Sequence, residues 1–278
     1  MKDSVKQIQV TAGEEESYKS YIHRPYVDLP EQVIKSLSGS PVAEKDILPF
    51  GKINELLAPG YLPVEIGYCN LRDGSIFTAM HTDMPGVTGE MIDWWYWWNP
   101  MHPLRYMMIH PRDHFGTGIQ GGLEEYSNRK GPYRSRIWNT VTYPVEDVGA
   151  GRDIVRMEFV RPDEFGLDME KFAKSRIETA ICARVGSRKK RIRQHGYMCH
   201  LVRKVKKGVE VRSRCWIGKK ILLNGFSAGS VVTKIINRRF IKKKLIPRQI
   251  GYTYCIHCSL ELNKLASILP ELYSRFAI

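Results

Sequence analysis

The chain has 278 residues, of which 43% are hydrophobic and 26% charged, and its formal net charge is +14. This length and composition suffice to bury a sizeable core, which excludes a disordered chain and one so small that disulfides must hold it together. No run of 18 or more apolar residues occurs and the first 21 residues are predominantly polar, so the sequence contains no membrane span and no signal-peptide core. We therefore expect a globular, cytoplasmic protein with no membrane partner.

The positive charge is concentrated in one segment. Between Arg184 and Arg248 the sequence has 21 lysines and arginines against one acid, Glu210, whereas the rest of the chain has 22 basic and 28 acidic residues. Such a segment can bind a polyanion, because neutralising phosphates gives affinity that does not depend on base sequence. No zinc finger, helix-turn-helix or aromatic ribonucleoprotein motif accompanies the charge. We therefore favour basic residues in hairpin turns and at solvent-facing strand positions, and we do not expect a nucleic-acid partner.

In chain order, three kinds of segment follow one another. Residues 1–75 are irregular, punctuated by proline and glycine, and predict a small domain or an arm that wraps something larger. From about Leu104 to Val232, β-rich runs recur between turns, among them RYMMIHP, DIVRMEFVRP and YMCHLVRKVKKGVEVRSRCWIG, which is typical of antiparallel meanders. From Gly251 to Phe276, apolar residues recur at helical spacing. The predicted fold class is α+β, with a curled antiparallel sheet gripping a long C-terminal helix.

A tryptophan cluster lies in DMPGVTGEMIDWWYWWN, residues 83–99. Thr88, two residues before Glu90, is a plausible helix start, and the helix that follows would carry a bulky apolar face. The cluster could wall an aromatic pocket, but we favour core packing between this helix and the sheet. The tryptophans are Trp94, Trp95, Trp97 and Trp98.

The cysteines number six and are irregularly spaced, which predicts free thiols in a reducing compartment. Cys255-x-x-Cys258 superficially suggests a redox dithiol or half of a zinc site. No second pair lies at zinc-site spacing, and the motif does not follow a strand in a βαβ unit. We interpret both residues as small buried hydrophobic groups.

A histidine and a glutamate, His257 and Glu261, stand four residues apart in the predicted final helix. Positions i and i+4 lie one turn apart on one helix face, so both side chains can reach the same ion. Chance produces such pairs often, but neighbouring leucines indicate a buried helix, where an ionised glutamate is costly unless a cation or hydrogen bonds compensate it. The spacing alone leaves open whether this is half of a metal site or an ordinary pair.

Further candidate ligands are spread along the chain. The run MHPLRYMMIHPRDHF has three histidines within 13 residues, and YPVEDVG and YMCHLV add acidic residues and another histidine. No glycine-rich phosphate loop, nucleophile elbow or Ser-His-Asp order appears, so we favour a metal hydrolase over covalent catalysis. The candidates are His102, His110, Asp113, His114, Glu146, Asp147 and His200.

Five ordered motifs resemble those of the 2,4-diacetylphloroglucinol and phloretin hydrolases, which hydrolyse the carbon–carbon bond between an acyl group and a phloroglucinol ring. They lie between Leu57 and Phe276 and read GYCNLRDGSIFTAMHTDMPGVTGEMIDWWYWW, RYMMIHPRDH, VEDVG, SRCWIGK and HCSLELNKLASILPELY. The resemblance implies a small N-terminal dimerisation domain, here residues 1–75, and a helix-grip catalytic domain like the birch pollen allergen, here residues 76–278. It also implies a homodimer and a small aromatic ketone as substrate.

The resemblance further implies a zinc ion held by two histidines and two glutamates. By motif order these fall on His114, Glu146, His257 and Glu261, with His110 as the rival for the first position. Iron or manganese could occupy the same donor set.

The catalytic positions of the family fall on His200, the histidine beside the metal ligands, and on Tyr106, which would also orient the substrate. Two substrate-contacting positions, an asparagine and a tyrosine in the family, fall near Thr117 and Cys215, which leaves open whether the acyl group is acetyl or arylpropanoyl. In the implied reaction, water activated by the metal attacks the aryl ketone and the ring leaves as a carbanion equivalent. The alternative from another class is a non-catalytic helix-grip protein that binds an aromatic or apolar ligand.

Overall fold

The computed structural model describes residues 11–277, so the first ten residues of the predicted N-terminal segment lie outside the described part. Within that part nine strands form one antiparallel sheet, in the order β1-β2-β9-β8-β7-β6-β5-β3, with β4 paired to β6. The strands are β1 (Gly67–Asn70), β2 (Ile76–Pro85), β3 (His114–Gly116), β4 (Thr140–Thr142), β5 (Val145–Glu146), β6 (Asp153–Val160), β7 (Ile177–Ser187), β8 (Ile192–Val205) and β9 (Gly208–Leu223).

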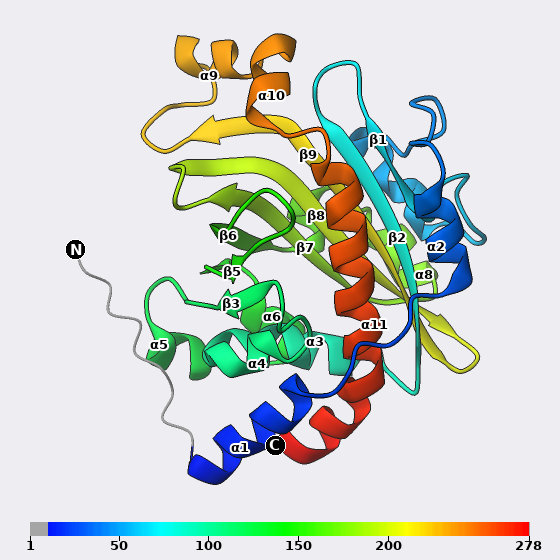
Figure 1. Cartoon of the computed structure of the whole chain (residues 1–278), viewed down its shortest axis with the longest axis vertical. Coiled ribbons are helices and arrows are strands. Elements are labelled where there is room, and N and C mark those ends of the chain that lie inside the picture. The colour runs from blue at the N-terminus through cyan, green and yellow to red at the C-terminus, as the bar shows by residue number, and fades with distance from the viewer. Residues whose placement is uncertain (1–10, 278) are drawn as a thin grey trace.

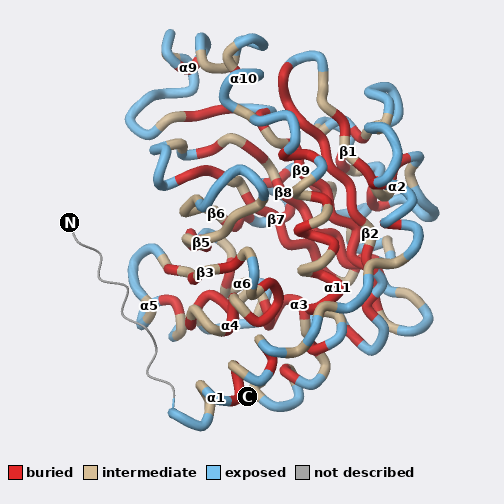
Figure 2. The backbone as a smooth tube through the Cα atoms, viewed as in Figure 1, coloured by how far each residue is buried: buried red, intermediate tan, exposed pale blue. Residues whose placement is uncertain are grey.

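The sheet curls around one long helix, α11 (Ile250–Phe276), which lies along its concave face (Figure 1). Leu265, Leu269 and Leu272 of this helix are completely buried, and the three- and four-residue steps between them place them on the face that packs against the sheet. Figure 2 shows that burial is concentrated along α11 and the central strands. The predicted α+β class, a curled antiparallel sheet around a long C-terminal helix, is therefore confirmed.

Shorter helices surround this core. Two predictions for these regions are wrong: the described part of the N-terminal segment, residues 11–75, contains helices between its irregular stretches, and the run RYMMIHP begins in a helix instead of a strand. The second difference has a local cause, because the His102 ring accepts a hydrogen bond from the backbone N–H of Leu104 and Pro103 occupies the first helical position. The helices are α1 (Ala12–Ile22), α2 (Glu31–Ser38), η1 (Phe50–Leu57), α3 (Gly89–Trp98), η2 (Asn99–Met101), α4 (Pro103–Met107), α5 (Leu123–Ser127), α6 (Tyr133–Ile137), α7 (Pro162–Phe165), α8 (Met169–Lys174), α9 (Val231–Ile236) and α10 (Arg239–Leu245).

Helix α3 carries the tryptophan cluster and begins after Thr88, whose hydroxyl accepts a hydrogen bond from the Met91 N–H. The Trp94 and Trp98 rings stack with their centroids 4.7 Å apart, and both side chains are buried. Core packing is thus confirmed for these two residues. Trp95 is also buried but lines the cavity described below.

The N-terminal segment packs into the same core. Tyr18 and Tyr21 of α1 are completely buried, and the Tyr21 hydroxyl donates a hydrogen bond of 2.8 Å to Glu271 on α11. The domain boundary at residue 75 and a dimerisation role for this segment stay predictions.

Two arginines of the basic segment depart from the expected solvent-facing position. Arg212 and Arg214 on β9 are 1% and 0% exposed, and both donate hydrogen bonds to Glu65, Arg212 from Nε at 3.0 Å and Arg214 from Nη2 at 2.7 Å. Burial alone would raise the pKa of Glu65, but the two guanidinium groups lower it to about 2. Pairing with the half-buried carboxylate of Glu65 is what makes these two buried charges tolerable. The interpretation of the basic segment as solvent-facing is therefore wrong for this pair, and also for Arg203 and Lys242, which are buried as well.

All six cysteines are buried and free, as predicted. Cys255 and Cys258 are 0% and 1% exposed, which agrees with their interpretation as small core residues. Among residues 11–277, no helix combines the length and the apolar character needed to cross a membrane.

Candidate metal centre

The register of two short strands brings His114 and Glu146 together. Strands β3 and β5 pair antiparallel with these two residues directly opposite each other. The distance from His114 Nε2 to Glu146 Oε2 is 3.8 Å, and the histidine is completely buried. Cross-strand pairing thus makes neighbours of two residues far apart in sequence.

Helix α11 supplies the other two predicted ligands. His257 Nε2 lies 3.8 Å from Glu261 Oε2, one helical turn further on, and 3.3 Å from His114 Nε2. Ligand atoms about 2.1 Å from one ion can be at most about 4.2 Å apart, so these distances suit a shared ion. Donor atoms of His114, Glu146 and His257 all lie within 4.8 Å of one another, and Glu261 joins this group through His257.

Both imidazole rings are held so that Nε2 faces the centre. His114 Nδ1 lies 2.9 Å from the carbonyl oxygen of Tyr106, and His257 Nδ1 lies 3.1 Å from Asp113 Oδ2. We assign the proton of each ring to Nδ1, since each of these partners can only accept a hydrogen bond. Two Nε2 lone pairs then face each other at 3.3 Å, an arrangement that a cation between them would stabilise.

The electrostatics of the site also favour a cation. Burial raises the pKa of Glu261 to about 7, and the negative charge of Glu146 contributes in the same direction. Burial lowers the pKa of His114 well below its usual range, and the neighbouring His257 lowers it further. For His257 burial acts in the same direction, but the hydrogen bond to Asp113 and the nearby glutamates outweigh it and raise the pKa. The raised pKa of His257 shows that the surrounding carboxylates favour a positive charge at this point, and a divalent cation bound by His114, His257 and the two half-buried glutamates would supply that charge.

Tyr106, on α4, contacts two of the predicted ligands. Its hydroxyl donates a short hydrogen bond to Glu146 Oε2, and its ring stacks on that of His114 with centroids 3.8 Å apart. Burial raises the pKa of Tyr106 well above its usual range, and the charge of Glu146 adds to this effect. The hydroxyl therefore remains protonated and acts as a hydrogen-bond donor.

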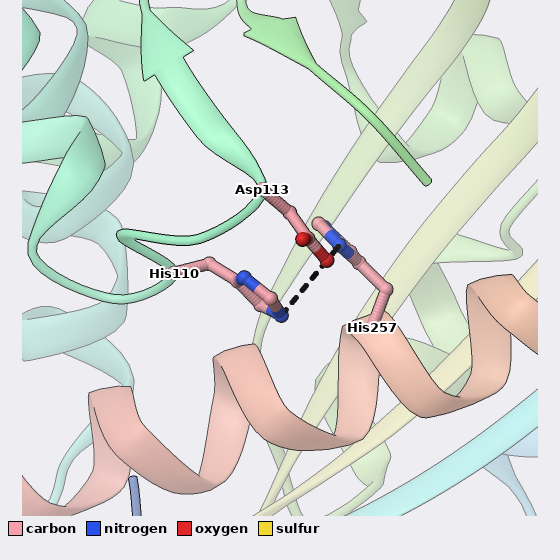
Figure 3. Close-up of side chains that lie close together, drawn as sticks. All are labelled: His110, Asp113 and His257. Atoms are coloured by element: carbon pink, nitrogen blue, oxygen red, sulfur yellow. Dashed lines mark hydrogen bonds and ion pairs between the residues drawn. The ribbon is translucent and has the colours of Figure 1, made fainter. Parts of the chain in front are cut away.

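His110, the rival ligand, stacks on the His257 ring, with the two ring centroids 4.3 Å apart. Figure 3 shows His110 and Asp113, which precede β3, pointing toward His257 on α11. His110 Nε2 is 3.4 Å from Asp113 Oδ2, the same oxygen that faces His257 Nδ1. The three residues form a second group that could hold an ion. This second group offers a single carboxylate, that of Asp113, whereas the group around His114 has two, those of Glu146 and Glu261. In addition, the Tyr26 hydroxyl lies 3.1 Å from the other ring nitrogen of His110, Nδ1. We therefore interpret Asp113 as the acceptor that holds the His257 ring; among the described residues the buried His110 Nε2 has no hydrogen-bond partner.

A cavity of about 60 Å³ adjoins the His114 centre. Besides aromatic side chains such as Trp95 and Tyr96, its walls include the predicted residues Tyr106, Thr117, Glu146, His200, His257 and Glu261. His200 Nδ1 is 2.6 Å from the Ser213 hydroxyl, and burial lowers the pKa of this histidine to about 4. His200 is therefore a neutral imidazole at pH 7.

A second cavity, of about 180 Å³, shares Glu146 and Tyr254 with the first. Its walls are largely apolar, with side chains that include Val155, Val185 and Ile217. Cys215, a predicted substrate contact, lines this second cavity and lies 3.2 Å from the Tyr254 hydroxyl. The sequence analysis missed Tyr254, although its spacing three residues before His257 and seven before Glu261 places it on the same face of α11.

Two comparisons of the sequence with known proteins identify one family. Residues 47–274 match the family described as the DAPG hydrolase PhiG domain. Phloretin hydrolase from Eubacterium ramulus is 30% identical over 96% of this chain and 94% of its own length. A 2,4-diacetylphloroglucinol hydrolase from Pseudomonas protegens is 23% identical over 93% of this chain and 84% of its own length. Among solved structures, a ginseng major latex-like protein from Panax ginseng covers 66% of this chain and 96% of its own at 11% identity and a TM-score of 0.32.

Proposed function

The chain belongs to the family of the DAPG hydrolase PhiG domain and is thus a hydrolase, and we propose that it cleaves the carbon–carbon bond between an acyl group and a phloroglucinol ring with zinc as its cofactor. The match confirms the resemblance noted in the sequence motifs. The observation that carries the proposal is the convergence of His114, Glu146, His257 and Glu261 beside a cavity. The names of the phloretin and 2,4-diacetylphloroglucinol hydrolases support the choice of substrate class.

The donor set suits zinc, which accepts mixed imidazole and carboxylate ligands, although iron and manganese accept them too. When bound, such an ion lowers the pKa of a coordinated water toward neutrality and so supplies a nucleophile for hydrolysis. The chain's own part begins with orientation of the ligands. Asp113 holds the His257 ring, the Tyr106 carbonyl holds the His114 ring, and the Tyr106 hydroxyl holds Glu146.

The remaining residues of the cavity handle the substrate and its protons. His200 is neutral, because its pKa is about 4, and it lines the cavity, so its imidazole can form a hydrogen bond with the attacking water and orient it. Tyr106 keeps its proton, which its hydroxyl donates to Glu146, so the phenol oxygen can still accept a hydrogen bond from a ring hydroxyl of the substrate. The phloroglucinol ring leaves with the electron pair of the broken bond, because its oxygens spread the charge, and its carbon then takes up a proton.

The two cavities suggest how the substrate divides between them. Three of the four predicted ligands, Glu146, His257 and Glu261, line the first cavity, of about 60 Å³, so the ketone must reach it. The second cavity, of about 180 Å³, has about three times that volume and largely apolar walls, which suits the acyl chain. Tyr254 borders both cavities, so in this proposal the ketone lies beside its ring.

The experiment compares wild type with His257→Ala and Glu261→Ala. Each variant should keep its fold but lose bound metal, measured by elemental analysis, and lose release of acid and phloroglucinol from an acylphloroglucinol. His23→Ala, at an exposed position of the N-terminal segment, is the matched control and should keep both. Full turnover in either site variant, or in thoroughly chelated protein, would refute the proposal. Ligand binding without product release would instead identify a non-catalytic binding protein.

A further inference from the structure

The segment 224–248, which we call the cap, joins β9 to α11 and contains α9 and α10. It projects at one end of the molecule, beyond the first turn of α11 (Figure 1), and most of its backbone is coloured as exposed in Figure 2. Within residues 11–277, eleven large hydrophobic side chains are exposed, and the cap holds six of them at 39% to 70% exposure. The six are Phe226, Val231, Val232, Ile235, Phe240 and Leu245. Scattered exposed hydrophobic residues are ordinary, but six within 20 residues are a local concentration that points to a binding surface.

The same segment is strongly basic. It contains seven lysines and arginines, and the whole stretch from Val211 to Leu260 has no aspartate or glutamate. Lys242 is buried and pairs with Asp73 at 3.3 Å. The other six are exposed, namely Lys234, Arg238, Arg239, Lys243, Lys244 and Arg248. The cap therefore presents apolar and positively charged groups together.

We propose that the cap is a docking surface for an anionic lipid bilayer. Apolar side chains such as Phe240 and Val231 would enter the boundary between headgroups and acyl chains, while the lysines and arginines contact lipid phosphates. Nucleic acid would use the charges, but it offers no apolar phase for the exposed valine, isoleucine and phenylalanine side chains. A second copy of the chain, meeting the cap with its own cap, would bring two acid-free basic surfaces together, which like-charge repulsion opposes.

The position of the cap gives the docking a consequence. Leu245, Ile246 and Pro247, at its C-terminal end, line the larger apolar cavity. Docking would therefore place a wall of this cavity against the lipid surface, where an apolar aryl ketone is concentrated. This second step rests on the proposed function, whereas the docking itself does not. The proposal also departs from the expectation of no membrane partner, because that expectation considered only spanning segments.

The test is co-flotation of the full-length protein with vesicles of phosphatidylcholine alone and of phosphatidylcholine mixed with phosphatidylglycerol. Binding should need the anionic lipid and weaken as salt is added. Each basic residue near an anionic surface strengthens binding about fivefold, so Lys234→Gln with Lys244→Gln should weaken it about 20- to 30-fold. Val231→Ser with Phe240→Ser should weaken it about tenfold or more.

The control is Ile34→Ser, which removes an apolar side chain that is 53% exposed on α2, outside the cap, and should leave binding unchanged. Turnover of a dissolved acylphloroglucinol without vesicles should be the same in wild type and both cap variants, so failure of docking is distinguishable from failure of the proposed reaction. No flotation with anionic vesicles, or equal flotation of wild type and both cap variants, would overturn the proposal. So would a cap that binds only nucleic acid or only a second copy of the chain.

Discussion

Replacing Asp113 by asparagine tests how the predicted metal centre is supported. Asp113 Oδ2 lies 3.1 Å from Nδ1 of His257, a histidine that is 4% exposed, so the pair is shielded from solvent on the histidine side. A hydrogen bond to a charged group contributes about 1.5–3 kcal/mol and a neutral one about 0.5–1.5 kcal/mol. Asp113→Asn keeps the shape and removes the charge, which costs about 1–1.5 kcal/mol. Since 1.4 kcal/mol is a factor of ten, zinc should bind about tenfold more weakly.

The assay is an equilibrium competition for zinc against a chelating dye, with thermal unfolding to check the fold. Asp147→Asn is the matched control, because the Asp147 carboxylate accepts hydrogen bonds only from the backbone N–H groups of Gly149 and Gly151 among its described partners. Unchanged affinity in Asp113→Asn would refute the orienting role. If Asp113→Asn instead weakened zinc binding by far more than about 100-fold and His114→Ala still bound zinc, the ligands would be His110, Asp113 and His257.

Three further predictions concern stability and substrate choice. Glu65→Gln should lower the free energy of unfolding by about 3 kcal/mol at pH 7, because the fold lowers the pKa of Glu65 from 4.5 to about 2. This contribution is fully present above pH 4.5 and is lost as the pH falls through about 2. The free energies of unfolding of wild type and Glu65→Gln, measured in urea, should therefore converge over that range. A difference between them that does not change with pH would contradict the prediction. Trp94→Ala should lower the free energy of unfolding by about 3–5 kcal/mol in the same assay, because the Trp94 side chain is 0% exposed. A decrease below about 1 kcal/mol would show that Trp94 does not stabilise the core. Ile217→Trp should narrow the larger cavity and lower kcat/KM for an arylpropanoyl ketone at least about tenfold while sparing an acetyl ketone; equal losses would place the acyl chain elsewhere.

The parts of the fold that the sequence predicted are those with local, periodic signals. The final helix was expected from Gly251 to Phe276 and extends from Ile250 to Phe276, because a long amphipathic pattern leaves few alternatives. Helix α1 was missed although Thr11 and Glu14 form a capping box, a signal that proline and glycine later in the segment obscured. The strand expected in RYMMIHP failed because its β-forming residues follow a strong helix start at His102.

What the sequence could not predict depends on contacts across long separations. Burial of Arg212 needs Glu65, a residue 147 positions earlier, and no local pattern links the two. Asp113 was among the candidates, but its role became visible only when α11 placed His257 beside it. By contrast, His257 and Glu261 could be paired from sequence, since the helical repeat fixes their relative position.

These differences separate the part of the site that the core holds in place from the part that a bound cation would hold. His257 and Glu261 lie on a 27-residue helix whose face is buried along the sheet, so their positions follow from the core. His114 and Glu146 lie on strands of three and two residues, which are too short to be stable alone. Their register is held by pairing of β5 with β6, by the Tyr106 hydroxyl and by the His114 ring against Tyr106. A cation shared by both pairs would therefore tie the weakly held strands to the firmly held helix, so that the ligands complete the fold around the same ion that the proposed chemistry needs.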